Sequence, residues 1–137
     1  MKYSKHAFKY LVEENFSVKT PIRSSREIDT WYCTLSPEGV LMVKRGFASD
    51  GASGWTFDTD ATKQPAVEHD IFYKLMRKKL VGVSWKPIID VFLRDRLVEE
   101  GMSKCRADMW LIMVDACGWK AATKPSKIYT TKHHVTL

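Results

Sequence analysis

A histidine, two aspartates and a tyrosine are spaced so that they could form one hydrolytic site. His69 and Asp70 are adjacent, and Tyr73 follows His69 by one helical turn. Adjacent side chains project about 100° apart on a helix, so His69 and Asp70 can serve different ligands. Asp90 lies near the start of the next predicted helix, on an apolar stripe. Because a buried carboxylate needs hydrogen bonds, we expect Asp90 to contact His69 and Tyr73.

These residue types suit water-mediated ester hydrolysis. A histidine that an aspartate holds in one tautomer can take a proton from water, while a divalent cation stabilises the oxyanion. His69 would be the base, Asp90 the orienting group and Asp70 a cation ligand.

The Gly-rich and Ser-rich loop at 46–53 is the natural source of further cation ligands, with Ser49 and Gly51 as the candidates. Oxygen ligands of this kind favour calcium over zinc. A structural interpretation stays open, because His-Asp pairs near helix starts are common and Asp50 belongs to an Asp-Gly turn pair.

The runs GFASDGAS, HDIFY and IDVF resemble the signature of a family of small uncharacterised proteins found mainly in bacteriophages and prophages. The resemblance covers residues 40–119 and implies a phage-encoded protein. Such a protein would act in the host cytoplasm during infection or belong to the virion. That family usually has a proline soon after DGAS, where this chain has Gly54 and Trp55, so the loop differs.

A second, shorter resemblance concerns AVEHDIFYKL and IDVFLRDRL. These runs are similar to the two catalytic helices of secretory phospholipases of the A-two type, most closely the disulfide-free form of parvovirus capsid proteins. The similarity implies that His69 is the catalytic histidine and Asp70 binds calcium, with Tyr73 and Asp90 in the supporting network. The glycine-rich calcium loop of those enzymes has no detailed match in this chain.

The first third of the chain is expected to be β-rich. Residues 30–35 and 40–43 are rich in β-branched and aromatic side chains and flank a Ser-Pro-Glu-Gly turn, which predicts a hairpin. Residues 4–16 have apolar side chains near helical spacing and predict a short helix, with a strand as the alternative.

Three helices are expected in the remainder. After a loop over 46–64, the first begins at Pro65 and is closed by Gly82, the second spans 86–100, and the third spans 104–117. The third is apolar almost all round between Met109 and Val114, which predicts a place at the centre of the core.

The sequence therefore predicts an α+β fold. A β-rich N-terminal third precedes a bundle of three principal helices, of which the first two are antiparallel because their connection is short. The length of 137 residues suits one domain, with strands and loops over 1–53, a helical core over 54–118 and a basic tail over 119–137.

The formal net charge of +6 favours anionic partners such as a phospholipid surface, nucleic acid or an acidic protein face. Nucleic acid ranks last because no binding motif is present. The tail lysines Lys120, Lys124 and Lys127 are candidates for a partner-binding arm, with a solvated surface as the alternative.

The cysteines and the apolar runs of the sequence indicate the cellular compartment in which the protein is expected. Cys33, Cys105 and Cys117 are an odd number at no metal-ligand spacing, so we expect buried side chains and a reducing compartment. The first 15 residues lack the features of a signal peptide, and no apolar run approaches the length of a transmembrane segment.

Two functions remain in contention at this point. One is a phage-encoded, calcium-dependent lipid ester hydrolase that acts on an anionic membrane. The other is a non-enzymatic phage protein, either a minor virion component or an effector that binds a host protein, in which the same residues serve as a structural scaffold.

Overall fold

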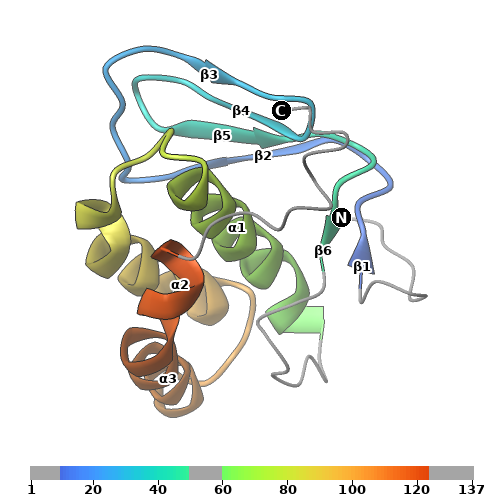
Figure 1. The fold of residues 1–137 in the computed structure, drawn as a ribbon. Helices are drawn as coiled ribbons and strands as arrows, with labels where there is room; N and C mark the ends of the chain where they lie inside the picture. Colours follow the sequence, from blue (N-terminus) through green and yellow to red (C-terminus); the bar gives the residue numbers. More distant parts are fainter. Residues whose placement is uncertain (1–9, 50–59, 124–137) are drawn as a thin grey trace.

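A computed structural model describes residues 10–49 and 60–123. A four-stranded antiparallel sheet forms one layer, and α1 (Asp60–Arg77) lies between this sheet and the other two helices, α2 (Lys86–Glu99) and α3 (Lys104–Thr123), as Figure 1 shows. A short 3-10 turn, η1 (Val83–Trp85), leads into α2. The α+β prediction, with three helices after a β-rich segment, is confirmed.

The sheet has the strand order β2-β5-β4-β3, and every neighbouring pair is antiparallel. A separate two-stranded ribbon pairs β1 with β6. The expected hairpin is present as β4 and β5. The strands are β1 (Tyr10–Leu11), β2 (Phe16–Lys19), β3 (Ile28–Asp29), β4 (Cys33–Leu35), β5 (Val40–Val43) and β6 (Ala48–Ser49).

The helix predicted over 4–16 is wrong in its described part, which begins at residue 10. Tyr10–Leu11 is a strand, which was the alternative that the sequence left open, and Phe16 begins β2. The side chains of β2 alternate between half-buried and exposed, so Phe16 and Val18 face the core with a period of two. Pairing with β5 stabilises this strand, so the local spacing that suggested a helix does not decide the structure.

Gly39 closes the turn of the hairpin and could not be another residue without distortion. Its φ is 99°, in the left-handed region, and its amide donates to the carbonyl of Ser36 at 3.0 Å. A Cβ at this position would lie 2.4 Å from the carbonyl oxygen of Thr20. The turn and the adjacent end of β2 therefore depend on a glycine here.

The helix boundaries differ from expectation at two places. Pro65 lies inside α1, which begins at Asp60. The helix also ends before Gly82, because Lys79 adopts a left-handed φ of 63° and the amide of Leu80 donates to the carbonyl of Leu75 at 2.9 Å. Lys79 thus takes the position after a helix that glycine usually fills.

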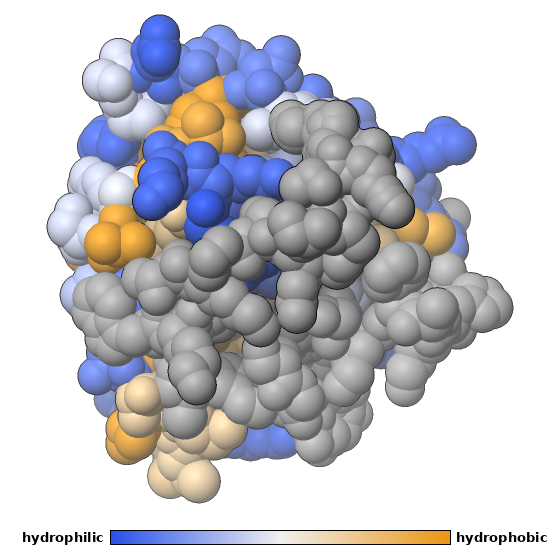
Figure 2. All heavy atoms as spheres, in the orientation of Figure 1, coloured by the Kyte–Doolittle hydropathy of each residue, from blue (hydrophilic) through white to orange (hydrophobic). Residues whose placement is uncertain are grey.

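The third helix is not central to the core. Trp110 and Val114 are buried, whereas Met109 is 58% exposed and Ile112 is 67% exposed, with Met113 also exposed. Figure 2 shows apolar side chains gathered at the lower left, over α3. The apolar side chains of residues 109–114 cover most of the circumference of α3, but only one side of the helix packs against α1 and α2. The other side is exposed.

The expectation of buried cysteines holds for Cys33, which is fully buried in β4, and is wrong for Cys105, which is exposed on α3. The surroundings of the Cys117 side chain lie outside the part of the structure that is described.

A buried ion pair joins α1 to α2. Arg96 donates from Nε and Nη2 to the two carboxylate oxygens of Glu68, at 2.9 and 3.0 Å. Glu68 is 1% exposed and Arg96 is 6% exposed. Burial raises the pKa of Glu68, and the hydrogen bonds from Arg96 oppose that effect. The pair therefore fixes the position of α2 along α1.

Arg96→Met should lower the free energy of unfolding by about 3–5 kcal/mol, because it leaves Glu68 as an uncompensated buried charge. Arg94→Met is the control, since Arg94 pairs with Asp108 near the surface and its loss should lower the free energy of unfolding far less. Urea unfolding of both variants tests this, and equal losses would contradict the role given to Arg96.

Candidate active site

Asp90 is the centre of a buried hydrogen-bond network. Its side chain has no exposed surface. Oδ1 lies 2.8 Å from His69 Nε2 and accepts a hydrogen bond from Tyr73 Oη, also at 2.8 Å. Oδ2 accepts a hydrogen bond from Lys86 Nζ at 2.6 Å. The expectation that Asp90 contacts His69 and Tyr73 is therefore confirmed.

Helical spacing on two helices places these groups. His69 and Tyr73 are four residues apart on α1, with ring centroids 4.2 Å apart, and Lys86 and Asp90 are four residues apart on α2. Residues at this spacing share a helix face, so each helix brings two members of the network to the interface between them.

Lys86 is the member that sequence reasoning missed. It is fully buried, and its ammonium lies 3.3 Å from the carbonyl oxygen of Val114 and 3.5 Å from that of Asp115. It therefore connects Asp90 to α3 as well as neutralising its charge. The spacing of Lys86 and Asp90 was a usable signal, but a lysine at a helix start is ordinarily exposed.

The network fixes the tautomer of His69, and burial determines its charge. Burial opposes the charge of Asp90, but hydrogen bonds from His69 and Lys86 outweigh it and hold the pKa of Asp90 below its usual range. An ionised carboxylate can only accept, so Nε2 of His69 carries the hydrogen. Burial lowers the pKa of His69, although Asp90 acts in the opposite direction. A neutral ring with its lone pair on Nδ1 follows.

Tyr73 acts as a fixed donor to the same carboxylate. Burial is the largest cause of the raised pKa of Tyr73, and the negative charge of Asp90 adds to it. The phenol therefore stays protonated throughout the physiological range. The Tyr73 hydroxyl and His69 Nε2 both hydrogen-bond to Asp90 Oδ1. The hydroxyl therefore restricts the positions that the imidazole can take at this oxygen.

Two of the three candidate cation ligands lie together. Ser49 is fully buried on β6, and its hydroxyl donates to Asp70 Oδ2 at 3.0 Å. Pairing of β6 with β1 holds Ser49 in place beside α1. The third candidate, Gly51, lies outside the described residues. Within 10–49 and 60–123, no group of three or more His, Cys, Asp or Glu side chains is arranged to hold a metal.

The candidate partner-binding lysines are only partly described. The backbone of Lys120 belongs to α3, which continues to Thr123, so the predicted tail begins as helix. Lys124 and Lys127 lie outside the described residues.

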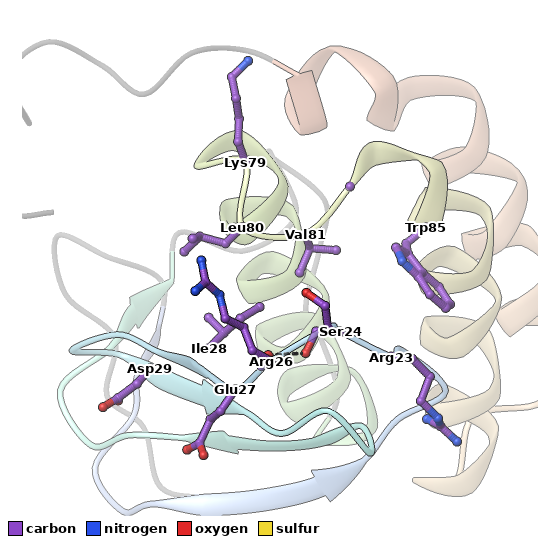
Figure 3. A pocket seen from close by; sticks show the side chains of 12 residues that line it. Arg23, Ser24, Arg26, Glu27, Ile28, Asp29, Lys79, Leu80, Val81 and Trp85 are labelled. Carbon is purple, nitrogen blue, oxygen red and sulfur yellow. Dashed lines mark hydrogen bonds between the residues drawn. The ribbon is translucent and has the colours of Figure 1, made fainter.

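A cavity of about 450 Å³ lies away from this network. Figure 3 shows it between the segment joining β2 to β3 and the turn that follows α1, with Arg26 extending toward Leu80 and the side chains of Glu27 and Asp29 on the other side of the loop. None of the four network residues lines it. Its lining is Arg23, Ser24, Ser25, Arg26, Glu27, Ile28, Asp29, Lys79, Leu80, Val81, Gly82 and Trp85.

Comparisons with protein-family models, with curated proteins and with solved structures found no match for this chain. Among residues 10–49 and 60–123, no helix has both the length and the apolar character that crossing a bilayer requires. The case for a function therefore rests on the geometry of the side chains.

Asp90→Ala should destabilise the fold by more than hydrogen bonding alone predicts, which is about 1–3 kcal/mol. It also removes the nearest anion of the buried Lys86 ammonium, whose other carboxylate neighbour, Asp115 Oδ1, lies farther away at 4.0 Å, so we expect about 3–5 kcal/mol. Lys86→Met in the Asp90→Ala background should recover part of this loss. Denaturant unfolding of the two single variants and the double variant measures the coupling, and strictly additive losses would show that the pair does not interact.

Acid should destabilise the protein through His69. The pKa of His69 is lower in the folded state, so the unfolded chain takes up this proton first and stability falls as the pH drops below about 6.5. Unfolding free energies at pH 7.5 and pH 5.5 should differ less in His69→Gln than in wild type. The same difference in both proteins would assign the pH dependence to other groups.

Proposed function

We propose that this protein is a calcium-dependent hydrolase of lipid esters. The observation that carries the proposal is the pair of hydrogen bonds that Asp90 Oδ1 accepts from His69 and Tyr73. The bond to His69 fixes the ring hydrogen on Nε2, and burial lowers the pKa of His69 and keeps the ring neutral, so Nδ1 is unprotonated and can act as a general base.

His69 takes the proton from a water molecule at Nδ1 as that water attacks the ester carbonyl. The resulting imidazolium is stabilised by the Asp90 carboxylate, and the proton then passes to the leaving alcohol. Asp90 and Tyr73 hold the ring in one orientation, so they are positioning residues. Lys86 keeps Asp90 ionised through its 2.6 Å hydrogen bond.

Asp70 and Ser49 lie together, joined by a hydrogen bond, and would supply oxygen ligands of the kind that calcium prefers. When bound, calcium stabilises the negative charge that develops on the ester carbonyl oxygen. The Ser49 hydroxyl also orients Asp70 toward β6. A carbonyl from Gly51, as the sequence suggests, would extend this set.

The proposal includes a phage origin and an anionic phospholipid surface as the partner. The viral family resemblance supports the origin, and the net charge of +6 supports attraction to anionic lipid. We place the protein in the host cytoplasm during infection or in the virion.

A second candidate is a non-enzymatic phage protein that binds a phage or host protein. The hydrogen bond from Ser49 to Asp70 favours it, because it satisfies one oxygen of that carboxylate without a cation. In this case the Asp90 network serves stability alone.

His69→Ala should abolish calcium-dependent release of fatty acid from anionic phospholipid vesicles, because it removes the base. Asp70→Asn should do the same by removing charge from the cation site. Both proteins should remain folded, as circular dichroism can verify. The assay compares labelled fatty acid release by each variant with that by wild type.

Lys19→Met serves as the matched surface control, since Lys19 is exposed on β2. It should retain full activity. Background release by wild type at every calcium concentration would rule out the hydrolase and leave the binding protein.

A further inference from the structure

The cavity between the β2–β3 segment and the turn after α1 is separate from the Asp90 network. Its volume of about 450 Å³ lies in the usual range of small-molecule pockets, roughly 300–1,000 Å³. Its two walls come from distant parts of the sequence, residues 23–29 and residues between 79 and 85. Ile28 and Val81, one from each wall, are buried members of the same apolar cluster. The core therefore holds the two walls in fixed positions.

One positive charge extends across this cavity. The guanidinium of Arg26 extends toward Leu80, as Figure 3 shows. The side chains of Glu27 and Asp29 lie on the other side of the loop. The ammonium of Lys44 lies 2.9 Å from the Asp29 carboxylate and engages it there. Neither carboxylate therefore neutralises Arg26 within the cavity.

The other two cations of the lining are directed elsewhere. Arg23 donates to the carbonyl oxygens of Thr20 and Ile22, each at 3.3 Å, and the side chain of Lys79 points away from the cavity in Figure 3. Within residues 10–49 and 60–123, the side chain of Arg26 makes no hydrogen bond or ion pair. Its planar fork of N–H donors is therefore available to one anionic group, with two parallel hydrogen bonds.

Apolar side chains with exposed surface lie along the same cavity. Leu80 is 47% exposed and Trp85 is half-buried, and both belong to the lining. A ligand that covered them would remove apolar surface from water, which favours binding. The lining therefore suits a molecule with an anionic group at one end and an apolar body at the other.

We propose that this cavity binds an organic monocarboxylate with a compact aromatic or aliphatic body. Arg26 binds the carboxylate, and Leu80 and Trp85 cover the body. The single cation that extends across the cavity matches the charge of one carboxylate, and the guanidinium plane matches its geometry. The site is independent of the proposed hydrolysis, since no residue of the Asp90 network lines it.

The first test uses 2-naphthoate as the probe and follows the indole N–H signal of Trp85 in NMR spectra of the full chain, assigned with Trp85→Phe. The signal should shift saturably, because the naphthalene rings would lie against the indole. The neutral analogue 2-naphthamide should bind about tenfold more weakly or worse, since it cannot form the charge-assisted bonds. Acetate, which has the charge without the rings, should give no saturable shift. Equal binding of 2-naphthoate and 2-naphthamide, saturable binding of acetate, or no saturable shift with 2-naphthoate would overturn the proposal.

Arg26→Gln tests the residue that binds the carboxylate. It should weaken binding of 2-naphthoate by about tenfold or more and change binding of 2-naphthamide by less than about twofold. Arg45→Gln is the matched control, because Arg45 is exposed after β5 and does not line the cavity. It should leave both affinities unchanged. Equal weakening by the two variants would assign the effect to net charge and contradict the site.

Leu80→Ala and a phosphate probe complete the test. Leu80→Ala should weaken 2-naphthoate and 2-naphthamide alike, by about threefold or more, because both lose the same apolar contact. Loss for the carboxylate alone would contradict the apolar role of Leu80. Tighter binding of 2-naphthyl phosphate than of 2-naphthoate would identify a phosphate site and overturn the carboxylate assignment. Because every readout is binding, the result does not depend on whether the protein hydrolyses lipid esters.

Discussion

The negative charge of Asp90 must be compensated inside the protein, and this requirement organises the helical layer. A carboxylate with no exposed surface is stable only when donors surround it. Here α1 provides an imidazole and a phenol, and α2 provides an ammonium from one turn before Asp90 itself. The two helices can therefore pack only in the register that brings these groups together.

Lys86 extends this constraint to α3, because its ammonium also reaches the carbonyl oxygens of Val114 and Asp115. The Glu68–Arg96 pair fixes the same α1–α2 interface farther along. Two buried charge clusters thus fix the position of α2, while apolar packing holds α1 to the sheet. The site and the fold share residues, so a change at Asp90 affects both.

The fold class, the hairpin and the contacts of Asp90 could be predicted from sequence because each depends on local periodicity. Strand β1 was predicted only as the alternative to a helix over 4–16, because the spacing there suits a helix and pairing with β6 is not a local property. The exposure of Ile112 was also beyond prediction, since hydrophobicity alone does not say how many neighbours a helix has. Lys86 was missed because its burial depends on the position of α3.

The tautomer of His69 is the central claim, since the assignment of Nδ1 as base depends on it. Nitrogen-15 NMR of the histidine ring, assigned with His69→Gln, measures this directly at pH 7. We predict a neutral ring that is protonated at Nε2 and unprotonated at Nδ1. A ring protonated at Nδ1 alone, or at both nitrogens, would contradict the account.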